Sequence, residues 1–196
     1  MTPSAQRRLS GPAPDAAELH DAALDYLARY AATEAGLRRI LERRIDRWLR
    51  RAGDADPETI AAQASAARVA VREVVARLVA AGAVNDAKYA ENRARSLVRS
   101  GRSRRATDAQ LRAKGVDSAT VQSVLPEDAE TELAAALVLA RKRRIGPFRR
   151  GAAADEAGRK QELGVLARAG FPQDVARRAL AMDPDQAETL VNEFRR

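Results

Sequence analysis

Residues 111–125 read LRAKGVDSATVQSVL, and residues 166–180, 55 positions further along the chain, read LARAGFPQDVARRAL. The first leucine, the glycine and the last leucine coincide, and the apolar residues between them fall in the same register. A shorter copy, LVAAGAV, occupies residues 78–84. Repetition at such a period is typical of small helical units that bury their apolar faces against one another. The doubled segment therefore predicts an all-α fold of tandem helical repeats.

The composition agrees with this fold class. The 196 residues are 45% hydrophobic, but the aromatic residues are only three Phe, three Tyr and one Trp. A core rich in alanine and leucine suits close-packed helices better than a sheet. No stretch alternates β-branched and polar residues at a period of two, so we expect no strand.

The spacing of apolar residues predicts about ten helices. The clearest period is the apolar stripe of one long helix, at Ile60, Ala64, Ala67, Val71, Val74 and Leu78. Thr33, Asp86 and Asp117 are suited to cap helix starts, and Gly82, Gly115 and Gly170 are placed to end helices in the left-handed conformation. The other expected helices cover about 21–31, 33–49, 86–100, 104–114, 117–125, 133–144, 155–169, 172–180 and 184–194.

These helices group in threes with one terminal addition. We predict a disordered basic tail over 1–18, a first three-helix repeat over 19–84, a second over 85–126, and a third with a C-terminal helix over 127–196. Each three-helix unit is too small to bury its own apolar face fully, so neighbouring units should pack end to end.

Enzymatic chemistry finds little support in the residues. The chain has no cysteine, which excludes disulfides and zinc–thiolate sites, and its single histidine, His20, has no catalytic neighbours in the sequence. The densest acidic cluster, Asp54, Asp56 and Glu58, surrounds Pro57 and reads as a helix start rather than as a metal site. We therefore expect no catalytic residue, no metal and no cofactor.

No membrane or export signal is expected either. The longest purely apolar stretch, 133–140, is far shorter than the roughly 20 residues that span a bilayer. The N-terminus lacks the apolar core of a signal peptide. These features predict a cytoplasmic protein with no membrane partner. The sequence also has no long coiled-coil seam that would require a dimer, so we expect a monomer.

The positive signal is basic charge, with a formal net charge of +8. Arginines of the 33–49 helix alternate with Glu42 and Asp46, which favours a solvated, ion-paired face. Two other clusters lie at expected helix ends, around Gly101 and around 145–148, where we expect the cationic groups to be free to reach a partner. The candidate binding residues are Arg93, Arg99, Arg102, Arg104, Arg105, Lys114, Arg141, Lys142, Arg143, Arg144, Arg149 and Arg150.

The arginine fork fits phosphate and carboxylate equally well, so these clusters suit either nucleic acid or an acidic protein. Phe148 is the only aromatic residue inside a basic cluster, whereas a platform that stacks bases needs several. The clusters thus predict contact with a nucleic-acid backbone or with protein, not with bases.

An ordered set of motifs resembles the RecX family of recombination regulators. The set begins with a leucine-bearing helix and a glycine turn at Gly82, which are followed by an acidic N-cap residue and an aromatic–alanine pair. It continues with an arginine-rich bend over 99–105 and ends with a leucine that precedes a Lys-Gly pair. The resemblance extends from about residue 20 almost to the end, and the residues that carry the pattern, which we expect to be structural, are Asp86, Tyr89, Leu111, Gly115, Leu166 and Gly170.

The resemblance implies three tandem three-helix repeats in a curved, elongated array. It implies a non-enzymatic protein that lies in the groove of the RecA–DNA filament. Such proteins modulate, and mostly inhibit, the ATPase, strand-exchange and coprotease activities of RecA in recombination and the SOS response. The implied partners are the RecA filament and, weakly and through the backbone, single- and double-stranded DNA.

Two features depart from the family pattern. Gly36 stands where the family carries the glutamate of a Ser-x-x-Glu capping box, and the connection over 44–66 is longer than usual. Two rival hypotheses also stay open. The chain could read DNA directly as a helix-turn-helix or architectural protein, through 111–125 or 166–180, or it could be a helical scaffold for another acidic protein.

Overall fold

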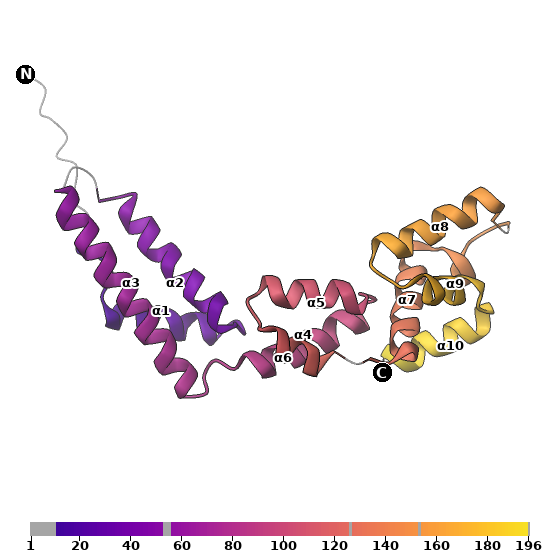
Figure 1. Cartoon of the computed structure of the whole chain (residues 1–196), viewed down its shortest axis with the longest axis horizontal. Helices are drawn as coiled ribbons and strands as arrows, with labels where there is room; N and C mark the ends of the chain where they lie inside the picture. Colours follow the sequence, from indigo (N-terminus) through magenta and orange to yellow (C-terminus); the bar gives the residue numbers. More distant parts are fainter. Residues whose placement is uncertain (1–10, 53–55, 126, 153, 196) are drawn as a thin grey trace, which may run out of the picture. The chain divides into compact units, whose positions relative to one another are not determined.

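The structure is a computed structural model that describes residues 11–52, 56–125, 127–152 and 154–195. Within those ranges it has ten α-helices, one short 3-10 helix and no strand (Figure 1). The predicted all-α fold is confirmed. Internal contacts divide the chain into two compact units, one up to Asp86 (unit 1) and the other from Ala87 onward (unit 2). The division into three repeats stays a prediction.

Unit 1 consists of α1 (Ala16–Leu27), α2 (Glu34–Leu49) and α3 (Pro57–Ala80), which all pack against one another. The predicted stripe of α3 faces this core: Ile60 is half-buried, and the other five positions are buried. The buried members of the core are Leu19, Ala23, Leu37, Leu41, Ile45, Ala64, Ala67, Val71, Val74, Val75, Leu78 and Val84.

The first helix corrects a predicted boundary. α1 starts at Ala16, five positions before the predicted start. This start lies inside the segment 1–18 that we assigned to the tail. Residues 1–10 of that segment lie outside the described ranges. The cause is a capping box, in which the Asp15 carboxylate accepts a hydrogen bond from the Glu18 N–H and the Glu18 carboxylate accepts one from the Asp15 N–H. α1 buries Leu19 and Ala23, whereas Leu24 and Tyr30 of the predicted helix 21–31 are 45% and 56% exposed.

Unit 2 begins with a small three-helix core. It comprises α4 (Asp86–Arg99), α5 (Arg104–Ala113) and the short α6 (Ser118–Val124). The starts and ends of α5 and α6 agree with the sequence prediction to within one residue, and Pro126 lies outside the described ranges. The buried residues of this core are Ala90, Ala94, Leu111, Val116, Val121 and Leu125.

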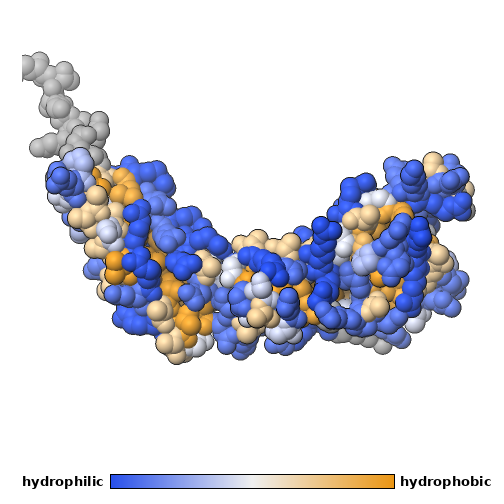
Figure 2. All heavy atoms as spheres, in the orientation of Figure 1, coloured by the Kyte–Doolittle hydropathy of each residue, from blue (hydrophilic) through white to orange (hydrophobic). Residues whose placement is uncertain are grey.

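The rest of unit 2 is built around α7 (Ala129–Arg143). Six consecutive residues of this helix, 133–138, are buried, because α8 (Glu156–Arg168), α9 (Gln173–Ala181) and α10 (Pro184–Arg195) all pack against it. The 3-10 helix η1 (Gly146–Phe148) follows α7 directly and contacts α9. In Figure 2 most of the visible surface is hydrophilic, with smaller hydrophobic areas between.

Candidate basic interface

The arginine-rich bend between α4 and α5 is held by a buried serine. Ser103 is fully buried, and its hydroxyl donates a hydrogen bond to the Ala169 carbonyl at the end of α8, across 2.7 Å. The same oxygen accepts a hydrogen bond from the Ala106 N–H at 3.2 Å and thereby caps α5. Gly101 has a φ of +85°, and a Cβ there would lie 2.9 Å from the Leu139 backbone nitrogen, so this bend is seated against α7.

A carboxylate of α7 supports the same bend. Glu132 accepts hydrogen bonds from the Arg104 N–H, the first amide of α5, at 2.9 and 3.2 Å. Burial raises the pKa of the Glu132 carboxyl, and this effect outweighs the opposing interactions with Arg104. A comparable contact exists in unit 1, where the Asp86 carboxylate accepts a hydrogen bond of 2.7 Å from the Glu34 N–H at the start of α2. An external carboxylate thus supports α2, whose own capping box lacks a glutamate at Gly36.

Several candidate arginines make intramolecular contacts, contrary to the expectation that they are free. Arg104 pairs with Glu127 at 2.9 Å, and Arg141 pairs with Glu188 at 2.9 Å. Arg149 pairs with the buried carboxylate of Glu162, which also accepts a hydrogen bond from the Gly146 N–H at 3.2 Å. Arg141 and Arg149 are held in place by acids distant in sequence, and a structural role explains them, whereas the pair of Arg104 with the 83% exposed Glu127 side chain is weak.

Of the other nine candidate cations, two have a partner and seven have none within the part of the chain that the structure describes. Lys114 is exposed and has a partner, and the Lys142 ammonium donates a hydrogen bond to the Ser100 carbonyl at 2.6 Å, which links the two basic clusters. The side chains without an ion pair or hydrogen bond among the described residues are those of the half-buried Arg93 and the exposed Arg99, Arg102, Arg105, Arg143, Arg144 and Arg150.

Arg144 stands out by its backbone. It ends α7 with φ 56° and ψ 46°, and in the described ranges it is the only residue other than glycine with a positive φ. The left-handed conformation costs an L-residue roughly 1–2 kcal/mol, which glycine would avoid. An exposed arginine at this position therefore costs stability, a pattern that often marks a functional position.

The residues that we predicted to be structural lie in the hydrophobic cores or at helix ends. Leu111 and Leu166 are fully buried, and Tyr89 packs half-buried on the core of α4–α6. Gly115 and Gly170 follow α5 and α8 with φ of +91° and +90°. A Cβ on Gly170 would lie 2.8 Å from the Ser103 hydroxyl, so this glycine permits the contact that holds the arginine bend.

Comparison with known proteins decides the family. The chain is 41% identical over 169 residues to the regulatory protein RecX of Myxococcus xanthus, an alignment that covers 85% of this chain and 86% of that protein. The chain belongs to the RecX family. It is also 37% identical over 111 residues to the regulatory protein RecX of Agrobacterium fabrum, with 57% of this chain and 59% of that protein covered.

The RecX relationship extends to domain and fold. Residues 85–125 match the family model described as RecX, second three-helix domain. The crystal structure of RecX from Lactobacillus salivarius superposes with a TM-score of 0.57 at 18% identity, covering 92% of this chain and 96% of that one, which supports the fold alone. The name shared by the RecX relatives describes a regulatory role rather than an enzymatic activity.

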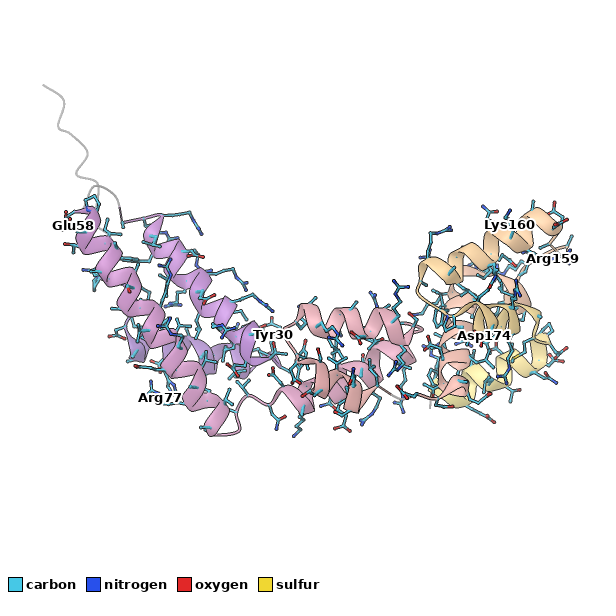
Figure 3. All side chains as sticks on the ribbon, viewed as in Figure 1. Tyr30, Glu58, Arg77, Arg159, Lys160 and Asp174 are labelled. Atoms are coloured by element: carbon cyan, nitrogen blue, oxygen red, sulfur yellow. The ribbon has the colours of Figure 1, made fainter. Side chains whose placement is uncertain are left out.

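The acidic cluster of this RecX family member has a structural explanation. Asp54 lies outside the described ranges, but the Asp56 carboxylate caps α3 by accepting hydrogen bonds from the hydroxyl and the N–H of Thr59 at 2.7 and 2.8 Å, which lower the pKa of Asp56. Figure 3 shows Glu58 in the first turn of α3, where the helix dipole favours an acid. Among the described residues, no three acidic or histidine side chains gather as metal ligands would. No helix in those ranges is both long and apolar enough to cross a bilayer.

Two residues that position the interface were not found from the sequence. Ser103 follows an arginine and precedes a helix, so its position as an N-cap was a readable signal. Glu132 offered no such signal, because its partner amide lies 28 residues away in the sequence and the contact exists only in the folded unit.

Proposed function

We propose that this RecX family member binds in the groove of the RecA–DNA filament and modulates, mostly inhibiting, RecA. The affected activities are ATP hydrolysis, strand exchange and coprotease action in recombination and SOS repair. The protein acts as a cytoplasmic monomer without catalytic residues or a cofactor. Membership of a family of regulatory proteins supports the regulatory part of this proposal.

The proposal rests on the exposed arginines of the two bends of unit 2 that have no ion pair or hydrogen bond among the described residues. Arg102 and Arg105 flank the buried Ser103, and Arg143 and Arg144 end α7. Because Lys142 bonds to the Ser100 carbonyl, the bend after α4 and the end of α7 are held together. A surface whose backbone is fixed in this way loses little backbone entropy when it binds an anionic partner.

A nucleoprotein filament is a suitable partner for such a surface. It repeats along its length and presents phosphates and acidic side chains, both of which the guanidinium fork recognises. Each exposed contact is weak, but several contacts made by one chain add through a high effective concentration. A filament is therefore favoured over an isolated anionic ligand.

The alternative, a sequence-specific DNA reader, has less support. In the 111–125 segment the Ser118 hydroxyl is already bonded to Arg112, and the Ser123 hydroxyl donates to the Thr120 carbonyl. In the other segment, Arg178 pairs with Glu130 at 2.8 Å, but both side chains are more than half exposed, so this pair is weak. The two hydroxyl groups would have to leave their partners before reading a base edge.

ATP hydrolysis by RecA on single-stranded DNA tests the proposal. We expect a saturable decrease in the hydrolysis rate as the full chain is added. An unchanged rate at saturating protein, together with tight salt-resistant binding to one duplex sequence, would support the DNA reader instead.

A further inference from the structure

A shallow hollow of about 470 Å³ in unit 2 is lined by polar side chains from three helices. Lys142 comes from α7 and Arg195 from α10. The remaining lining residues, all on α4 or immediately after it, are Asn92, Arg95, Ser96, Arg99 and Ser100. Most of these were not candidate residues in the sequence, because the hollow exists only where α4, α7 and α10 are assembled.

The spacing along α4 explains this side of the hollow. Positions 92, 95, 96 and 99 are three, four and seven residues apart and lie on one face of the helix. The buried residues Ala90, Ala94 and Leu97 occupy the opposite side, against the cores. The helix thus presents an amide, a hydroxyl and two guanidinium groups together to solvent.

The hollow concentrates positive charge. Its lining includes Arg95, Arg99, Lys142 and Arg195 and, among the described residues, no carboxylate. Arg99 and Arg195 have no ion pair or hydrogen bond from their side chains within the described residues, and Lys142 is fixed by its 2.6 Å bond to the Ser100 carbonyl. Arg95 pairs with Glu91 at 2.7 Å, but both side chains are more than half exposed, and such a pair is weak and exchangeable.

We propose that this hollow binds the phosphodiester backbone of DNA, without sequence preference. The proposal deepens the proposed function, on which it rests, by assigning this part of the basic surface to DNA rather than to protein. Arginine and lysine would neutralise phosphate charge, and the Asn92 amide and Ser96 hydroxyl would donate to phosphate oxygens. None of the described residues that line the hollow is aromatic, which argues against stacking of bases there.

The chemistry of the lining favours phosphate over an acidic protein surface. Every lining side chain is polar, and none could accept the apolar anchor around which a protein interface is usually centred. A phosphate backbone needs no such anchor, since charge neutralisation and counterion release supply most of the affinity.

Binding of the full chain to fluorescently labelled oligo(dT) and to a mixed-sequence duplex, without RecA, tests this assignment. The variant R99Q/R195Q keeps the Lys142–Ser100 bond and removes two charges. We expect its affinity for both DNAs to fall roughly tenfold at low salt. The slope of log K against log salt should fall in magnitude by about 1.4 for the single strand, at ~0.7 per lost phosphate contact.

The matched control is R72Q/R77Q, which removes the same charge from α3 in unit 1. Both side chains are exposed and have no ion pair among the described residues. Arg77 is labelled on α3 in Figure 3. Unchanged thermal unfolding of both variants verifies folding. Equal loss of DNA affinity in the two variants would overturn the proposal, as would a normal affinity in R99Q/R195Q.

Two further measurements distinguish a wrong site assignment from a wrong proposed function. A poly-glutamate peptide in place of DNA should show little dependence on Arg99 and Arg195; a dependence as strong as that for DNA would reassign the hollow to acidic protein. RecA ATP hydrolysis with the native chain reports on the proposed function alone. If the native chain alters hydrolysis but R99Q/R195Q binds DNA normally, the site assignment fails and the regulatory function stands.

Discussion

The hydroxyl of Ser103, at the start of α5, donates a hydrogen bond to the backbone carbonyl of Ala169, at the end of α8, across 2.7 Å. The two residues are 66 positions apart in the sequence. Through this contact the arginine-rich bend at 99–105 is attached to the second copy of the Leu-x-x-x-Gly segment, which ends at Gly170. The repeated segment is therefore structural support for the bend.

Removal of this hydroxyl should destabilise unit 2. Ser103→Ala removes the cap of α5 and leaves the Ala169 carbonyl without this donor, so we expect a loss of about 1–2 kcal/mol in the free energy of unfolding. Urea unfolding followed by circular dichroism measures it. Ser123→Ala is the control, because that exposed hydroxyl bonds only to the Thr120 carbonyl one turn earlier, and it should cost less than about 0.5 kcal/mol.

The glycine beside Ser103 should tolerate no side chain. Gly170→Ala places a Cβ 2.8 Å from the Ser103 hydroxyl in addition to requiring a positive φ. Gly82→Ala requires a positive φ of similar kind, but nothing lies within 4 Å of the new Cβ. We expect Gly82→Ala to cost about 1–2 kcal/mol and Gly170→Ala clearly more, measured by the same unfolding experiment. Equal costs would mean that the close approach at Gly170 has no energetic weight.

The charge on Glu132 should be unfavourable near neutral pH. Because burial raises its pKa in the folded state, its contribution to stability is fully present below the unfolded value near 4.5 and is lost as pH rises through the folded pKa. Glu132→Gln keeps an acceptor for the Arg104 N–H without the charge. We expect this variant to be more stable than the native chain at pH 7, with the difference shrinking at pH 4.

Glu132→Ala removes both the acceptor and the charge, so comparison with Glu132→Gln measures the contribution of the acceptor alone. This variant leaves the first amide of α5 without its partner, so we expect it to be about 1–2 kcal/mol less stable than Glu132→Gln at both pH values. An advantage of Glu132→Gln that grows at low pH would contradict the direction of the pKa shift.

We expect Arg144 to lower the stability of the fold and to contribute to binding of the RecA filament. Arg144→Gly relieves the left-handed conformation at the end of α7, and we expect a gain of about 1 kcal/mol in unfolding free energy. Arg143→Gly is the control, since it removes the same charge from the preceding helical residue and should lose up to about 1 kcal/mol. Both variants should bind RecA filaments more weakly; native binding by Arg144→Gly would exclude this side chain from the interface.

The sequence predicted those parts of the fold whose signals are local. The stripe from Ala64 to Leu78 fixes the buried face of α3 by spacing alone, and Asp117 and Gly115 mark where α6 begins and α5 ends. The start of α1 was missed although its signal was present, because Asp15 and Glu18 form a capping box ahead of the first strong apolar period.

Which arginines have an intramolecular partner could not be predicted in this way. Whether a guanidinium group is available depends on acids brought near by folding: Glu188 lies 47 residues from Arg141, and Ser100 lies 42 from Lys142. A run of basic residues such as 141–144 therefore contains both structural and available cations. Only the packing of α7 against α4 and α10 separates them.

Co-sedimentation of the full chain with preformed RecA filaments on single-stranded DNA measures filament binding directly. We expect saturable binding of the native chain to filaments, in excess of its binding to the same DNA without RecA. The variant R102A/R105A/R144G should bind several-fold more weakly while the R72Q/R77Q control binds normally. Native protein that stays in the supernatant at saturating filament, or binds no better than to bare DNA, would rule out the proposed binding to the RecA filament.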